Sequence, residues 1–132
     1  MYAVEVRDHI MIAHSLPRPV FGPAQGMHGA TFEVDAAFFT REVDADGLGV
    51  DMGLAIGLLK EVLAPLNYQN LDELEIFRGR VTTTEVLSRH VFDALAAKIR
   101  EGAFGPGNGR IERIRVTLHE SHVARAWYEG EL

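Results

Sequence analysis

Two histidines stand at positions from which they could do chemistry. His14 ends an alternating segment over residues 2–14, and His28 opens the next alternating segment. In both segments the histidine falls on the same face as the apolar residues. If the segments are neighbouring antiparallel strands, both imidazoles lie at the same end of a sheet. Imidazoles brought together in this way are typical metal ligands, although a lone histidine at a strand end is more often simply hydrogen-bonded.

A carboxylate stands in a comparable position further along the chain. Glu120 follows the apolar series Ile114, Val116 and Leu118 in an alternating segment over 110–120. On that phase its side chain is expected to be at least partly buried, where an unpaired carboxylate is costly. It then needs a hydrogen-bond donor from the protein or from a ligand. The plain alternative is a strand-end glutamate that faces water or caps a turn.

Composition excludes several classes of site. The chain has 132 residues, which suits one domain, expected over residues 1–132. It contains no cysteine, which rules out a thiolate–zinc centre and a cysteine nucleophile. Its formal net charge is −6 with no basic run, which argues against nucleic acid as a partner. No apolar run is long enough for a membrane span and no signal peptide is recognised, so a cytoplasmic protein is expected.

Period-two alternation predicts the strands that would position these side chains. Strands are expected over 2–14, from residue 28 onward, and over 110–120 and 122–129, the last two as a hairpin. Loops are expected where prolines, glycines and polar residues gather, over 15–26, 41–49, 67–81 and the link "AFGPGNGR" at 103–110. That link lacks the lysine of a phosphate-binding loop.

Apolar residues recurring at three and four predict two helices, over 51–66 and 82–102. Asp51 suits the N-cap of the first helix. Thr82 and Glu85 have the spacing of a capping box for the second, and Gly102 suits its C-terminal stop. The order β-β-α-α-β-β predicts an α+β fold, with a small antiparallel sheet and two helices on one face.

Five stretches resemble one family in type and order. They are "IAHSL" (12–16), "HGATFEV" (28–34), "GLGVDMGLAIGLLKEVL" (47–63), "TTTEVLSRHVFDAL" (82–95) and "VTLHESHVARAWY" (116–128). The chain resembles the 6-pyruvoyl-tetrahydropterin synthases and the related 6-carboxytetrahydropterin synthases over nearly its whole length. The resemblance implies the tunnelling fold, a homotrimer whose sheets close a barrel, commonly a homohexamer, and a pterin site between subunits.

The resemblance also implies a zinc site that is incomplete here. Two of the family's zinc histidines match His14 and His28, whereas the third matches Ala30. Because a catalytic zinc normally keeps three protein ligands, two imidazoles need a further ligand. Gln25, Tyr68, a neighbouring subunit or the hydroxyl groups of the ligand itself are the candidates.

The remaining family positions divide into binding and reactive residues. The pterin-anchoring glutamate matches Glu120, and a threonine-containing binding segment matches residues 82–85, which implies ligand contacts for Thr83 and Glu85. The catalytic cysteine matches Ala24, and the aspartate–histidine pair matches Asn67 and Tyr68. The binding residues are thus present, whereas the reactive residues are replaced.

We therefore expect a divergent member of this family that binds a pterin or a similar heterocycle through Glu120. Activity on the pterin side chain, as a lyase, would need a different acid or base, for which Tyr68 is the candidate. The rival interpretations are a catalytically inactive pterin-binding protein, a structural oligomer, and a fold adapted to a different substrate.

Overall fold

Five strands form a single sheet in this computed structural model, in the order β3-β1-β2-β4-β5. The structure describes residues 1–106 and 110–132, so part of the link predicted over 103–110 lies outside the described residues. The strands are β1 (Tyr2–His14), β2 (His28–Thr40), β3 (Gln69–Asn70), β4 (Ile111–His119) and β5 (Arg125–Glu131). Neighbouring strands are antiparallel except β1 and β3, which run parallel.

The long strands confirm the predicted alternation. β1 has the predicted bounds, and β2 begins at His28 as expected. In the register of this pair His14 lies directly opposite His28, so the two histidines do share one end of the sheet. β4 and β5 form the predicted hairpin, with the Glu120 amide donating to the Ala124 carbonyl in its turn.

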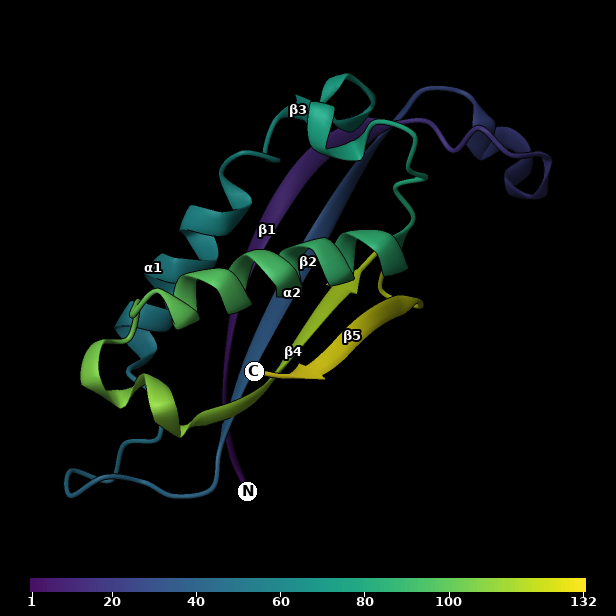
Figure 1. Cartoon of the computed structure of the whole chain (residues 1–132). Coiled ribbons are helices and arrows are strands. Elements are labelled where there is room, and N and C mark those ends of the chain that lie inside the picture. The colour runs from purple at the N-terminus through teal and green to yellow at the C-terminus, as the bar shows by residue number, and fades with distance from the viewer.

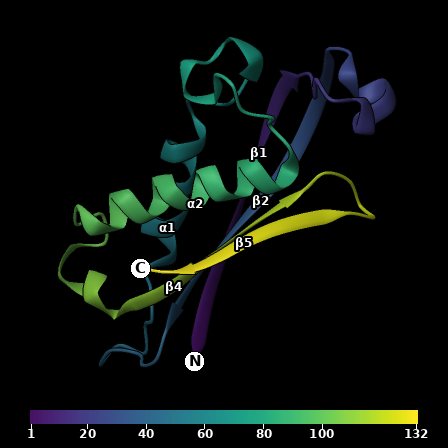
Figure 2. The ribbon, with the colours of Figure 1, turned by 45° about the vertical axis from the view of Figure 1, so that its right-hand side comes forward.

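Two helices, α1 (Met52–Leu63) and α2 (Thr84–Arg100), lie on one face of the sheet, as Figures 1 and 2 show. The Asp51 side chain caps α1 by accepting from the Leu54 amide, as predicted. The capping box predicted for α2 is wrong, because Thr83 is the N-cap and accepts from the Val86 amide. Counting from that cap, Glu85 stands one position too early to complete the box.

The C-terminal end of α2 confirms the predicted stop at Gly102. This glycine has a φ of 99°, its amide donates to the Ile99 carbonyl, and the Ala103 amide donates to the Lys98 carbonyl. The two hydrogen bonds form a Schellman motif, in which the left-handed residue is best a glycine. The chain then turns back toward β4, the strand that carries Glu120 just beyond its end.

The core lies between the helices and the even-numbered face of the long strands. Alternate strand residues point into it, and the fully buried ones include Ile10, Phe32, Val34, Phe38 and Ile114. The opposite face of the sheet carries charged side chains that pair across strands, such as Arg7 with Asp35. Among the described residues, no helix is both long and apolar enough to cross a membrane.

Two connections gather around the end of the sheet where the histidines lie. The first contains the 3-10 helix η1 (Pro19–Gln25) and extends beyond the sheet at the upper right of Figure 1. The second, predicted as a polar loop over 67–81, contains β3 and two short 3-10 helices, η2 (Leu71–Glu73) and η3 (Glu75–Phe77). It docks on β1, where the Asn67 side chain accepts from the Met11 amide and the Tyr68 amide donates to the Met11 carbonyl.

Candidate functional site

The two histidines form a close pair. Their ring centroids are 4.6 Å apart and the ring planes meet at 63°. The pairing of β1 with β2 produces this contact, because the last residue of one strand faces the first residue of the other. Each imidazole projects from the core face of its strand, as the alternation predicted.

His14 is the buried member of the pair, with 4% of its surface exposed. Its Nδ1 lies 2.9 Å from the Thr82 hydroxyl. Burial and the neighbouring His28 lower the pKa of His14, whereas Asp72, the Thr82 backbone and Glu120 act in the opposite direction. Because burial dominates, His14 is neutral at pH 7 and one of its ring nitrogens is an acceptor.

The pair fits only part of a zinc site. Ala30, on the same face two residues after His28, contributes a methyl group and no ligand. Within the part of the chain that the structure describes, no group of three or more His, Cys, Asp or Glu side chains could hold a metal ion. A catalytic zinc site uses three protein ligands, so the donors of one chain do not fit zinc by themselves.

Glu120 lies in the hairpin turn after β4 and is exposed, which corrects the expectation of partial burial. The core face of the sheet ends with Leu118, and the chain turns back before a further side chain can be covered. The Thr84 hydroxyl donates to Glu120 Oε2 over 3.3 Å. This carboxylate is therefore accessible, and most of its capacity to accept hydrogen bonds is open to a ligand.

The start of α2 connects the histidines with the carboxylate. Thr82 contacts His14 and Thr84 contacts Glu120, and both threonines are buried. Sequence reasoning missed these two residues and selected Thr83, whose side chain is engaged as the helix cap. The signal was present in the "TTT" run, because alternate residues of an extended segment point the same way.

Glu85 and Tyr68 are placed less centrally than expected. Glu85 lies on the exposed side of the first turn of α2. Tyr68 adopts a left-handed φ of 59° and is 75% exposed. Across the described residues, no hydrogen bond or ring contact joins the Tyr68 side chain to the histidines or to Glu120. The Gln25 amide, a candidate third ligand, donates to the Gly22 carbonyl in its own turn.

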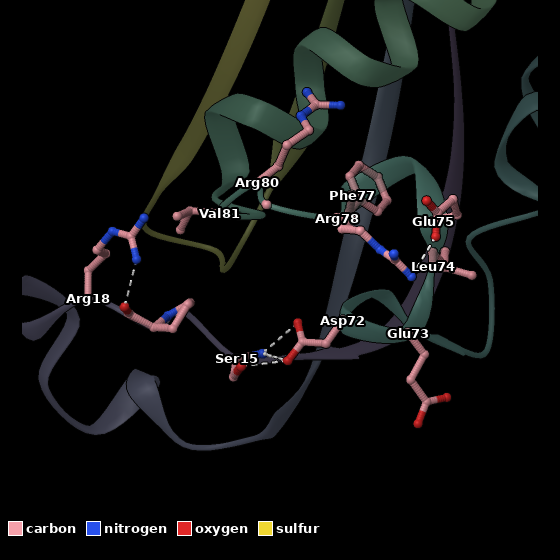
Figure 3. A pocket seen from close by; sticks show the side chains of 12 residues that line it. Ser15, Arg18, Asp72, Glu73, Leu74, Glu75, Phe77, Arg78, Arg80 and Val81 are labelled. Atoms are coloured by element: carbon pink, nitrogen blue, oxygen red, sulfur yellow. Dashed lines mark hydrogen bonds and ion pairs between the residues drawn. The ribbon is translucent and has the colours of Figure 1, made fainter.

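A cavity of ≈ 280 Å³ adjoins the histidine pair (Figure 3). It is lined by Ser15 and Val81, the neighbours of His14 and Thr82 in the chain, and by residues of the connection between the helices. Asp72, which also lines the cavity, accepts hydrogen bonds from the amide and hydroxyl of Ser15. Neither histidine nor Glu120 lines this cavity, so it lies beside the candidate site rather than forming it.

Comparison with protein families gives one match over almost the whole chain. The family model of 6-pyruvoyl tetrahydropterin synthase matches residues 3–131. No curated protein sequence matches the chain.

Solved structures with a fold similar to that of this chain include members of the same family. The 6-pyruvoyl tetrahydropterin synthase of Caenorhabditis elegans is similar with a TM-score of 0.81 and 22% identity, over 98% of this chain and 95% of that chain. The synthase of Plasmodium vivax has a TM-score of 0.75 and 13% identity, over the whole of both chains. An uncharacterized protein from Wolinella succinogenes has a TM-score of 0.69 and 13% identity, over 96% of this chain and 97% of that chain.

Proposed function

Because this chain belongs to the 6-pyruvoyl tetrahydropterin synthase family, as a divergent member, we propose that it binds a pterin or a similar fused heterocycle. The observation that carries the proposal is the accessible Glu120 carboxylate, which the start of α2 connects with the His14–His28 pair through Thr84 and Thr82. Thr84 gives this carboxylate one long hydrogen bond, which a ligand can supplement or replace.

The chemistry of recognition follows from the shape of the two partners. A pterin ring presents a ring N–H and an exocyclic amino group side by side. A carboxylate such as Glu120 accepts from both at once, and this paired, charge-assisted geometry is strong and selective. Glu85, on the exposed side of the first turn of α2, adds a second negative charge at the start of this helix. Positively polarised ring edges are thus favoured over anionic ones.

A lyase acting on the pterin side chain is the catalytic form of this proposal. The acid or base would be Tyr68, since Ala24 and Asn67 have no titratable group. Tyr68 is exposed and its hydroxyl is unpaired among the described residues, so this hydroxyl is available as an acid or base. No step is assigned to zinc, because the chain supplies two of the required ligands.

The second candidate is a pterin-binding protein without catalytic activity. It is favoured by Asn67, whose side chain is engaged in holding the segment before β3 against Met11. An amide used in this way belongs to the scaffold and does not orient a catalytic group. This form of the proposal keeps the site of Glu120 and assigns no chemistry to Tyr68.

Binding and turnover separate the alternatives. Titration with neopterin, followed by its fluorescence, should show saturable binding at one site per chain. Incubation with dihydroneopterin and with its triphosphate, followed by chromatography of the pterin products, then distinguishes the lyase from the inactive binder. A protein that binds none of these pterins would exclude both forms of the proposal.

A further inference from the structure

The outer face of α1 differs in chemistry from that of α2. The outer face of α2 is charged, and Arg89 and Asp93 form an ion pair on it. The first two turns of α1 instead expose apolar side chains, because Met52 is 61% exposed, Leu54 50% and Ile56 54%. A helix that meets only water is expected to carry polar residues on its outer face. The start of α1 therefore has the composition of a contact surface.

This apolar surface continues beyond the helix. Leu54 lines a hollow of ≈ 260 Å³ that extends to Leu48, an exposed residue of the preceding loop. On the other side of the helix face, Met52 and Ile56 stand four positions apart and so are neighbours on the helix surface. The α1 patch is defined here as Leu48, Met52, Gly53, Leu54, Ile56 and Gly57.

Gly57 leaves room for a close approach to the α1 patch. It lies inside α1, where glycine is less favourable than alanine. Apart from the neighbouring backbone of its own helix, no atom of the described residues lies within 4 Å of the point where its Cβ would stand. The packing of this chain therefore does not require a glycine here. Gly53, one turn earlier, is exposed on the same face, so a partner helix could rest on both glycines.

We propose that the α1 patch is a two-fold contact surface for a second copy of this chain, with the two α1 helices antiparallel. In a pair that crosses between Gly53 and Gly57, positions equally far from the crossing point lie opposite each other. Lys60 stands about 7 Å beyond that point, at a rise of about 1.5 Å per residue. It therefore comes opposite the start of the other helix, where Asp51 carries a negative charge. Both residues are exposed, and two-fold symmetry forms the pair twice.

The apolar side chains match in the same arrangement. A two-fold axis across antiparallel helices brings each flank of the α1 patch against the same flank of the other copy. Met52 and Ile56 then meet Met52 and Ile56, and Leu54 meets Leu54. A partner of uniform charge would leave either Lys60 or Asp51 unmatched, whereas a second copy matches both.

The α1 patch is remote from the candidate site. Leu54 shares its hollow with Ile111, the first residue of β4, at the end of the sheet where β2 finishes. His28 lies at the opposite end, where β2 begins. The inference is therefore independent of the proposed function, and pterin binding does not enter its test.

Single cysteines test the contact directly, because the chain has none of its own. Ile56→Cys places a thiol on the α1 patch, close to the same thiol of the other copy. Mild oxidation of the full chain with copper phenanthroline should link most of it into a covalent dimer on a non-reducing gel. Arg100→Cys, at the exposed C-terminal end of α2, is the control and should remain a single chain. Equal dimer yields from the two variants, or none from Ile56→Cys, would overturn the inference.

Particle mass from light scattering at micromolar concentration is the second measurement. Ile56→Glu places like charges opposite each other, whereas Gly57→Leu keeps the α1 patch apolar but fills the space between the helices. Each should halve the particle mass, with folding checked by circular dichroism. Arg100→Gln changes the net charge by the same amount as Ile56→Glu and should leave the mass unchanged. An unchanged mass in both patch variants would overturn the inference and leave the α1 patch to a different protein.

Discussion

At the scale of single residues, the His14–His28 pair is fixed in place by its surroundings, whereas Glu120 is not. His14 is buried between His28 and Thr82 and makes a hydrogen bond of 2.9 Å. Glu120 is exposed and accepts one hydrogen bond, 3.3 Å long, from the Thr84 hydroxyl. The histidines are therefore preorganised, whereas the carboxylate can turn toward a ligand. Substitutions at Glu120 should change affinity without changing stability, because little of the fold depends on its side chain.

Tyr68 gives a prediction that separates binding from chemistry. Tyr68→Phe removes one hydroxyl from an exposed side chain that contacts neither the histidines nor Glu120 within the described residues. We expect neopterin affinity to stay within twofold, while turnover of dihydroneopterin, if the parent shows it, falls by about 10²-fold or more, as for loss of a general acid or base. Steady-state kinetics measured beside the fluorescence titration decides this. Unchanged turnover in the variant would remove Tyr68 from the mechanism.

Part of the site could be predicted from residue types and strand phase. The pairing of His14 with His28 followed from alternation and antiparallel order alone. The exposure of Glu120 did not, because the phase of a strand says nothing about the residue at which the chain leaves the sheet. Thr82 and Thr84 were missed for a related reason. Which of three consecutive threonines caps the helix depends on where the helix starts, and element boundaries are the least certain part of a sequence prediction.

At the scale of elements, neighbouring residues at the start of α2 have different roles. Thr83→Ala removes the side chain that accepts from the Val86 amide, so the free energy of unfolding should fall by about 1 kcal/mol. Pterin affinity should not change, since Thr83 is engaged as the cap. Urea denaturation and ligand titration of the same preparation measure the two effects. Thr83→Ser is the control that keeps the cap. A loss of pterin affinity in Thr83→Ala would instead support the ligand contact predicted for Thr83.

A network on the open face of the sheet ties β1, β2 and β4 together. Arg7 donates to Asp35 over 2.6 and 2.9 Å, and His119 Nε2 lies 2.7 Å from the same carboxylate. The Arg7 hydrogen bond lowers the pKa of Asp35 from its ordinary value of 3.8, and burial opposes this shift. The unfolded chain therefore binds the proton more readily. The stabilisation is present above pH 3.8 and is lost as the pH falls from there through the lower pKa of the folded state.

Asp35→Asn should accordingly reduce the free energy of unfolding at pH 7 by about 1–2 kcal/mol, a modest value because the Arg7 partner is half exposed. Its stability should also depend less on pH below 3.8 than that of the parent. Urea titrations at several pH values measure both. Glu112→Gln, which breaks the exposed ion pair with Arg41, is the control and should change stability by less than about 0.5 kcal/mol. If the free energy of unfolding of Asp35→Asn fell as steeply with decreasing pH as that of the parent, the role given to Asp35 would be contradicted.

The long elements could be predicted well, and the short one could not. β1 and the hairpin follow from period-two alternation, and α1 and α2 follow from apolar spacing and caps. β3 has two residues, too few to carry a period, and it forms because Asn67 and Tyr68, the two residues before it, dock on Met11. Tertiary hydrogen bonds, rather than local preference, create this strand.

At the scale of the whole molecule, the sheet has two strands with open edges. β5 is the last strand on one side, and β3 covers only the Ile12–Ala13 end of β1 on the other. Unpaired edges favour pairing with another chain, and the family resemblance implies closure into a barrel. We therefore predict a trimer or a hexamer by light scattering at micromolar concentration. A clean monomer under these conditions would contradict the proposed barrel, while the fold of the chain itself would stand.

The central claim is that Glu120 anchors a fused heterocycle, and titration of Glu120→Gln with neopterin tests it most directly. The amide keeps the shape but replaces one acceptor by a donor that faces the amino group of the ring, so the loss should be about 1.5–3 kcal/mol. We predict at least a tenfold weaker affinity with unchanged stability, and no change in Glu101→Gln, an exposed glutamate at the far end of α2. Binding by Glu120→Gln as tight as that of the parent would contradict the claim.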